Sequence, residues 1–408
     1  MFEGNNKRKV RPFYSPPTLV LKQAMSALYL AASTGWTRLP VWLLRGRKTL
    51  PTAAGAIGMG CIGFPIHPVW EVTAACNLKC KQCHAAAGRP HPEELSTEEG
   101  KRLLDQMAEI PEFRMLAFGG GEPLVRPDIY ELVEYACNLG FEVSIATNGT
   151  LLTREAAARL KDIGVVNMAI GLNARDKKVH ESITQVPGSF EKTVEAVYHT
   201  LEMGLNLQIN TTVMNENRAS IPDLLDFAAE VGTEIVLLYH LMPEGRGEMD
   251  MELSLKEYQS TVELIADKQR TSSAIIEPVC YPQYWAYLVQ QNGQDTWRTK
   301  IANAFFKGCV AGSGLCYIKP NGDVWPCPFV PISGGNVRHT PLPQIWYESE
   351  LFNSLRDRSN LKGKCGSCTY REVCGGCRGR AYAHRGDYLE SDPVCFLDHL
   401  HSTTTAVP

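Results

Sequence analysis

The stretch that decides the fold reads Val-Trp-Glu-Val-Thr-Ala-Ala-Cys-Asn-Leu-Lys-Cys-Lys-Gln-Cys and covers residues 69–83. Its first five residues, Val69–Thr73, have the β-branched and aromatic composition of a strand. Cys76, Cys80 and Cys83 follow in what we expect to be the loop at the strand's carboxyl end. Three clustered thiolates can bind one iron–sulfur cubane and leave its fourth iron without a protein ligand. The alternative is a structural zinc site with His84 as the fourth ligand.

After this loop, short apolar runs alternate with helical patterns, which is typical of consecutive parallel βα units. Six strands are predicted, at Val69–Thr73, Met115–Phe118, Val143–Ala146, Val166–Leu172, Leu207–Val213 and Ile235–Tyr239. Helices are predicted at Thr97–Ala108, Ile129–Leu139, Arg154–Lys161, Phe190–Met203, Pro222–Glu230 and Leu255–Lys268. The pattern predicts an α/β fold with an open, partial (β/α)6 barrel of the TIM type. In such folds the chemistry lies in loops at the carboxyl ends of the strands.

Two of these loops carry polar motifs. Gly119-Gly-Gly-Glu-Pro123 follows the second predicted strand, and Thr147-Asn-Gly149 follows the third. Each motif alone indicates only a turn, because glycine and asparagine are common turn residues. Because both motifs follow the cysteine loop in successive strand-end loops, together they indicate a functional site more strongly than either does alone.

A second group of cysteines begins after Gly308, where the βα pattern has stopped. Glycine, proline and polar residues separate its eight members, so metal rather than apolar burial would organise this region. A pair of zinc sites is the alternative, and a disulfide framework is disfavoured in a chain long enough to build a core. The eight are Cys309, Cys316, Cys327, Cys365, Cys368, Cys374, Cys377 and Cys395.

Taken in this order, the motifs resemble the radical S-adenosylmethionine (SAM) superfamily with a C-terminal SPASM extension. The resemblance implies that Cys76, Cys80 and Cys83 bind a 4Fe-4S cluster whose open iron takes the amino and carboxylate groups of SAM. Reductive cleavage of SAM would then give a 5′-deoxyadenosyl radical. It further implies cofactor contacts from Gly120, Gly121, Glu122, Asn148 and Asn173, with a charge-assisted bond between Glu122 and the SAM ammonium.

The resemblance also implies two auxiliary 4Fe-4S clusters, and therefore three clusters in all. One would be bound by Cys309, Cys316, Cys327 and Cys377, and the other by Cys365, Cys368, Cys374 and Cys395. Three cysteines are left over: Cys61, Cys137, which we expect in a helix facing the core, and Cys280, which could face substrate. A low-potential electron donor such as flavodoxin or ferredoxin is implied as partner.

Two blocks, Tyr239–Gly247 and Leu361–Cys395, look most like the haem-synthase (coproheme decarboxylase) branch, although peptide maturases share much of them. A tetrapyrrole or similar cofactor precursor is thus the expected substrate, with a ribosomal peptide or a membrane lipid as alternatives. Three features depart from the family pattern: Gln82, Asn173 and the pair Thr184-Gln185. A non-catalytic iron–sulfur or zinc-held binding protein is the alternative of a different class.

The predicted organisation is an arm and Gly-rich linker at 1–67, a radical SAM core at 68–270, a bridging region at 271–307, a SPASM domain at 308–400 and a tail at 401–408. Residues 1–50 hold nine Lys or Arg against one acid, together with apolar runs. That composition suits peripheral membrane contact or an arm packed on the barrel. The overall charge of -3 gives no indication of nucleic-acid binding, and the cysteine chemistry predicts a reducing, cytoplasmic location.

Overall fold

The computed structural model describes residues 67–111, 113, 115–291 and 308–397. The predicted arm and linker, apart from His67, and the predicted tail lie outside these residues. The described chain contains one curled sheet with the strand order β7-β6-β5-β4-β3-β2-β1-β8-β9. Its strands are β1 His67–Glu71, β2 Met115–Gly119, β3 Glu142–Thr147, β4 Asn167–Gly171, β5 Asn206–Val213, β6 Ile235–His240, β7 Ile275–Val279, β8 Leu315–Ile318 and β9 Val324–Trp325.

All six predicted strands are present as β1–β6, each parallel to its neighbours, so the predicted partial barrel is confirmed. The sheet also extends beyond the prediction at both edges. β7 pairs in parallel with β6, and the apolar pattern does not predict it because Glu277 and Pro278 interrupt the run. β8 pairs in parallel with β1, and β9 pairs antiparallel with β8. The C-terminal cysteine region therefore continues the barrel sheet.

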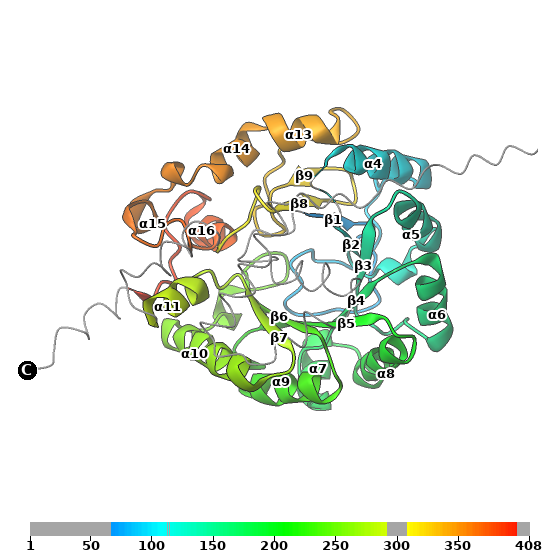
Figure 1. Ribbon diagram of the computed structural model, residues 1–408, viewed down its shortest axis with the longest axis horizontal. Helices are drawn as coiled ribbons and strands as arrows, with labels where there is room; N and C mark the ends of the chain where they lie inside the picture. The colour runs from blue at the N-terminus through cyan, green and yellow to red at the C-terminus, as the bar shows by residue number, and fades with distance from the viewer. Residues whose placement is uncertain (1–66, 112, 114, 292–307, 398–408) are drawn as a thin grey trace, which may run out of the picture.

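Helices form the outer ring of the molecule (Figure 1). The capping box predicted at Ser96 and Glu99 is confirmed at the start of the first of them. Around the barrel lie α4 Thr97–Glu109, α5 Ile129–Asn138, α6 Arg154–Ile163, α7 Lys177–Thr184, α8 Ser189–Glu202, α9 Ile221–Glu230, α10 Leu255–Thr271 and α11 Gln283–Gln291. The C-terminal region adds α13 Leu342–Glu348, α14 Glu350–Arg356, α15 Gly363–Ser367 and α16 Arg378–Arg385.

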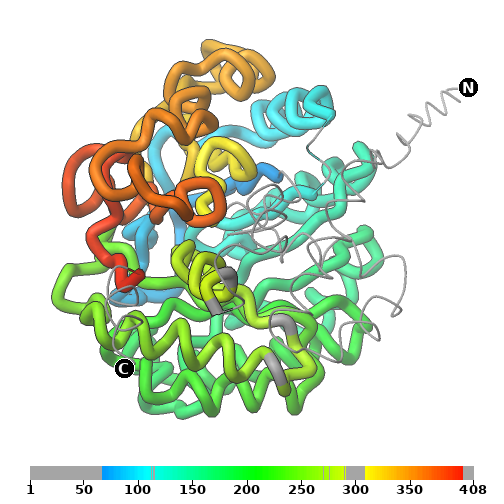
Figure 2. Tube along the Cα trace, turned by 60° about the vertical axis from the view of Figure 1, so that its left-hand side comes forward, coloured from blue at the N-terminus to red at the C-terminus, as the bar shows by residue number. Residues whose placement is uncertain are grey.

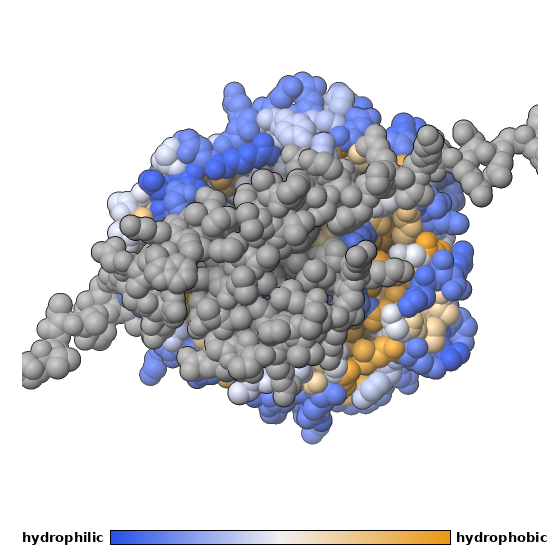
Figure 3. Space-filling view, in the orientation of Figure 1, coloured by the Kyte–Doolittle hydropathy of each residue, from blue (hydrophilic) through white to orange (hydrophobic). Residues whose placement is uncertain are grey.

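The C-terminal helices occupy the sector of the ring between α4 and α11 (Figure 1). Figure 2 shows this region, coloured orange to red, against α11. Gln283 of α11 donates to Asp392 at 2.9 Å, which joins the two parts through a buried hydrogen bond. Hydrophilic side chains cover the outer rim, and hydrophobic ones gather inward of α5 and α6 (Figure 3). None of the helices in the described part of the chain has the length and hydrophobicity of a transmembrane span.

Candidate active site

The three-cysteine loop is held at the carboxyl end of β1 by the segment that follows β6. The Arg246 guanidinium donates to the carbonyl oxygen of Cys80 at 2.8 Å, and its backbone N–H donates to that of Cys83 at 3.0 Å. Gly245 approaches so closely that a Cβ there would lie 2.2 Å from the carbonyl oxygen of His84. Residues far apart in sequence thus fix the shape of the loop.

The thiols of this loop lie near one another. Burial raises the pKa of the Cys80 thiol to about 12, and the neighbouring sulfurs of Cys83 and Cys76 add to the rise. Burial likewise raises the pKa of Cys76, with further contributions from Glu122 and Cys83. Because cysteine binds metals as the thiolate, three such sulfurs together suit a positive centre between them. An iron–sulfur cubane fits this donor set.

His84 has partners other than the cysteines. Its Nε2 lies 3.2 Å from the hydroxyl of Tyr317 and 3.6 Å from the carboxylate of Glu71. Tyr317 donates to Glu71 at 2.6 Å, and Lys319 forms an ion pair with the same carboxylate. Burial raises the pKa of Glu71, but His84 and Lys319 outweigh burial and hold it at about 2. This arrangement does not support the zinc alternative, in which His84 would be the fourth ligand.

Gly120 and Gly121 bring the loop after β2 against the cysteine loop. Gly120 has a φ of +135°, at which a side chain would be strained. The N–H of Gly121 donates to the carbonyl of Thr73 at 2.8 Å. A Cβ at Gly121 would lie 2.1 Å from the carbonyl oxygen of Ala75 and 2.9 Å from Cβ of Cys76. The two glycines are therefore required for the close approach of the loops.

Glu122 is fully buried, and its carboxylate is bonded to the loop after β3. It accepts hydrogen bonds from the Thr147 hydroxyl at 2.8 and 2.9 Å and from the Asn148 N–H at 2.7 Å. The Leu124 N–H adds a third donor at 3.1 Å. Burial raises the pKa of Glu122, and these donors oppose the rise. Glu122 therefore connects the loop after β2 to the loop after β3 through hydrogen bonds.

Asn148 and Asn173 border the cysteine loop from two sides. The Nδ2 of Asn148 donates to Asn77 at 2.8 Å and lies 3.9 Å from the Cys76 sulfur. The Oδ1 of Asn173 accepts from Nε2 of Gln82 at 3.1 Å. The Oε1 of Gln82 is buried and has no hydrogen-bond partner among the described residues. An orphaned acceptor next to Cys83 suits a polar ligand such as SAM.

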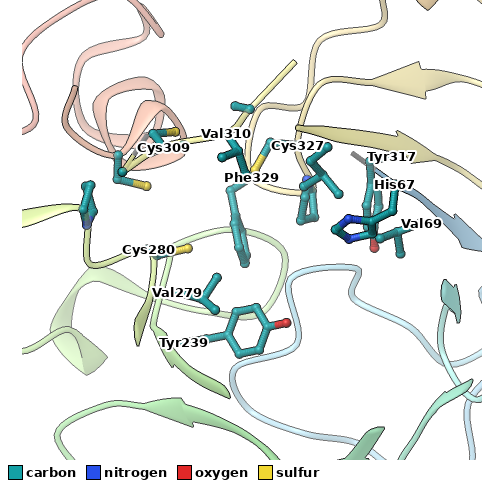
Figure 4. Close-up of a pocket in the computed structure, with 17 residues that line it drawn as sticks. His67, Val69, Tyr239, Val279, Cys280, Cys309, Val310, Tyr317, Cys327 and Phe329 are labelled. Carbon is teal, nitrogen blue, oxygen red and sulfur yellow. The ribbon is translucent and has the colours of Figure 1, made fainter. Parts of the chain in front are cut away.

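A cavity lies between the barrel and the C-terminal region, and we call it the inner cavity. Barrel residues form one end of it and cysteines the other (Figure 4). The barrel end includes His67, Val69 and Tyr317, and the cysteines that line the cavity are Cys280, Cys309, Cys327 and Cys377.

A second cavity, the outer cavity, is lined by Cys365, Cys368, Cys374 and Cys395. The structure thus brings the second predicted set of four cysteines together. Backbone N–H groups point at these sulfurs: Tyr370 donates to Cys368 at 3.3 Å, and Gly376 donates to Cys374 at 3.4 Å. Such bonds stabilise thiolates and tune the potential of an iron–sulfur cluster.

Cys316 does not lie with the other three cysteines of its predicted set. It stands on β8 between Leu315 and Tyr317, which line the inner cavity. Because side chains alternate along a strand, Cys316 points to the opposite face. There it is fully buried in a hydrophobic cluster with Ile345 and Phe352. Burial raises the pKa of its thiol far above the usual range.

Glu277 is a buried residue that the sequence motifs do not identify. Among the described residues neither of its carboxylate oxygens has a hydrogen-bond partner. It shares a strand face with Val279, which lines the inner cavity. Burial raises the pKa of Glu277 well above its usual range and so favours the protonated carboxyl. The sequence signal that could have identified Glu277 is its position as the one acidic residue of an otherwise apolar run, Ile275–Val279.

Comparisons with known proteins identify the family. Residues 70–228 match the Radical SAM superfamily, and residues 309–377 match SPASM, an iron–sulfur cluster-binding domain. An AdoMet-dependent heme synthase of Methanosarcina barkeri is 38% identical over 331 residues, covering 80% of this chain and 95% of that protein. The chain belongs to the radical SAM superfamily. This radical SAM protein is therefore an iron–sulfur oxidoreductase that uses SAM, and its SPASM domain adds cluster-binding capacity to that of the core.

Other radical SAM proteins are more distant. The mycofactocin maturase MftC of Mycobacterium tuberculosis is 30% identical, with 82% of this chain and 84% of MftC covered. The crystal structure of Streptococcus suis SuiB bound to the precursor peptide SuiA superimposes with a TM-score of 0.67 at 22% identity. That match covers 82% of this chain and 76% of SuiB, and it supports the half-barrel fold.

Proposed function

We propose that this radical SAM enzyme oxidatively decarboxylates propionate side chains of a tetrapyrrole. The observation that carries the proposal is the similarity to AdoMet-dependent heme synthase, which extends over 95% of that relative and exceeds the similarity to peptide maturases. Decarboxylation to a vinyl group removes a hydrogen atom, carbon dioxide and one further electron. Auxiliary clusters suit the acceptance of that electron.

Cys76, Cys80 and Cys83 are the proposed ligands of the SAM-cleaving cluster. When bound, the cluster supplies the electron that breaks a carbon–sulfur bond of SAM. The chain's own contribution is to hold the cofactor and exclude water. Backbone groups of Gly120 and Gly121 and the amides of Asn148 and Asn173 are the proposed SAM contacts. Glu122 is a further proposed SAM contact, through a charge-assisted bond to the ammonium group, and its hydrogen bonds to Thr147 and Asn148 fix the loop that follows β3.

Two auxiliary 4Fe-4S clusters, one for each cysteine-lined cavity, are part of the proposal and bring the total to three. The inner cavity adjoins the barrel interior, which suits an electron path away from substrate. A flavodoxin or ferredoxin in a reducing, cytoplasmic compartment is the proposed electron donor. Membrane contact through residues 1–50 stays a prediction, because that segment lies outside the described residues.

Maturation of a ribosomal peptide is the second candidate function. It is favoured by the similarity to MftC and by the fold shared with SuiB, which binds a precursor peptide. Modification of a lipid has no comparable support.

Anaerobic reconstitution tests the enzyme class. The loaded protein should bind about twelve irons, four for each cubane. With dithionite and SAM it should release 5′-deoxyadenosine, and Cys76→Ala should abolish the release. The matched control is Cys137→Ala, which changes a half-buried cysteine on α5 outside the proposed ligand sets. Zinc in place of iron would reject the enzymatic function.

Mass spectrometry of substrates tests the chemistry. An iron porphyrin with propionate groups should lose carbon dioxide and two hydrogens for each propionate converted, together with formation of 5′-deoxyadenosine. An intact porphyrin in the presence of active SAM cleavage would reject the tetrapyrrole substrate. Tight binding and conversion of a precursor peptide would favour the second candidate.

A further inference from the structure

Cys280 lies directly after β7, and its side chain lines the same cavity as that of Cys377 and is close enough to interact with it. Cys327 is also within electrostatic reach of Cys280. Cys309 is in turn close enough to interact electrostatically with Cys327 and Cys377. Figure 4 shows Cys280, Cys309 and Cys327 around the same end of the inner cavity. These thiols therefore form one group.

A buried ion pair fixes the backbone at both ends of the Cys280–Cys377 contact. Arg380 Nη2 donates to the carbonyl oxygen of Cys280 at 3.0 Å, and the N–H of Cys377 donates to Asp392 Oδ2 at 2.7 Å. Arg380 and Asp392 are joined at 2.7 Å, and both side chains are fully buried. Cys280 has a φ of +64°, which lies in the left-handed region that non-glycine residues rarely adopt. The surrounding contacts hold this residue in a defined orientation.

Cys316 is the alternative to Cys280, because the family resemblance assigns it to the same cluster as Cys309, Cys327 and Cys377. Its side chain packs in the hydrophobic core on the opposite face of β8. To reach the inner cavity it would have to shift the register of β8, which pairs Cys316 with Pro68 of β1. A one-residue slip would also turn Tyr317 away from the inner cavity and from its bond to Glu71.

We propose that Cys280, and not Cys316, is the fourth thiolate of the auxiliary cluster held by Cys309, Cys327 and Cys377. The inference rests on the proposed auxiliary clusters but is independent of the substrate. A cubane offers four irons, and this group supplies one sulfur for each. Since Cys280 follows barrel strand β7 and the other three belong to the C-terminal region, the cluster would also join these two parts covalently.

Cys280→Ala and Cys316→Ala provide the matched test in the full-length, anaerobically reconstituted chain. We expect Cys280→Ala to lose about four irons per chain, one cubane, or to retain them with an altered electron paramagnetic resonance signal of one auxiliary cluster. Cys316→Ala should keep the iron, the sulfide and the signal of the unmodified protein. Unchanged iron and an unchanged signal in Cys280→Ala would overturn the proposal, even if product formation were lost. Cluster loss in Cys316→Ala would also overturn it.

A second variant covers the case in which Cys280→Ala does not fold. Cys280→Ser keeps the size of the side chain and offers an oxygen ligand, so it should retain the cluster with a shifted resonance signal; an unshifted signal would overturn the assignment. Release of 5′-deoxyadenosine in the absence of substrate reports that the barrel is intact. Failure of the proposed function is distinct, because it would appear in the unmodified protein as absent iron or as an unchanged porphyrin.

Discussion

Gln82 and Asn173 are hydrogen-bonded to each other, with 3.1 Å between Gln82 Nε2 and Asn173 Oδ1. One residue lies in the cysteine loop and the other after β4, and both depart from the family pattern. Asn173 is anchored in turn by Asn217, whose Nδ2 donates to its carbonyl oxygen at 2.9 Å. The two departures therefore form a single polar contact at the edge of the proposed SAM site.

A double-mutant cycle should show that these residues act together. Gln82→Ala and Asn173→Ala should each weaken SAM binding, and the double variant should be little weaker than the single ones. The expected coupling is about 0.5–1.5 kcal/mol, as for one hydrogen bond between neutral groups. The measurement is the dissociation constant of SAM for the anaerobic, cluster-loaded protein. Additive losses would show that the two amides contribute independently.

Gly121→Ala should disturb the contact between the β2 loop and the cysteine loop, because the added Cβ would meet the carbonyl oxygen of Ala75 at 2.1 Å. Backbone atoms must then move, and we expect a loss of at least tenfold in the rate of SAM cleavage, about 1.4 kcal/mol. The matched control is Gly88→Ala, whose Cβ would meet nothing within 4 Å. Equal rates for the two variants would contradict a requirement for close approach at Gly121.

The sequence predicts the parts of the site that depend on short spacing. Cys76, Cys80 and Cys83 lie within one loop, so their proximity follows from the chain itself. The outer cysteines also come from one compact stretch, and the structure brings them together. Spacing alone predicts only the first of these features. The grouping of the outer cysteines is implied by the family resemblance, since Cys377 lies three residues after Cys374 and yet lines the other cavity.

Features that depend on contacts between residues far apart in the sequence could not be predicted from spacing. The face of β8 on which Cys316 lies depends on its register against β1, and no spacing along the chain determines that register. The contact of Cys280 with Cys377 depends on β7, which the apolar pattern does not predict. The sequence therefore identifies the cysteines as a class and leaves their grouping to tertiary structure.

Asp392→Asn should strongly destabilise the C-terminal region. Burial raises the pKa of Asp392, but the Arg380 guanidinium outweighs burial and holds the pKa at about 2, so the pair is charged. Removing one partner leaves a buried cation and should cost about 3–5 kcal/mol. The control is Glu191→Gln, which breaks a half-exposed ion pair with Lys177 and should have little effect. The measurement is the unfolding midpoint of the anaerobic, cluster-loaded protein; similar midpoints for both variants would contradict the prediction.

Glu142 should make the free energy of unfolding depend on pH with the opposite sign to Glu99. Burial raises the pKa of Glu142 from 4.5 to about 7, so the folded protein retains a proton that the unfolded chain releases, and stability falls as pH rises from 4.5 to 7. Glu142→Gln should therefore gain stability relative to the unmodified protein across that window, on the order of 1–3 kcal/mol. The bond to Arg338 lowers the pKa of Glu99 from 4.5 to about 2, so its contribution is present above pH 4.5 and is lost as pH falls toward 2. Glu99→Gln should thus lose stability relative to the unmodified protein at neutral pH. The measurement is the free energy of unfolding from chemical denaturation at several pH values. A change in the same direction for Glu142→Gln and Glu99→Gln would contradict the prediction.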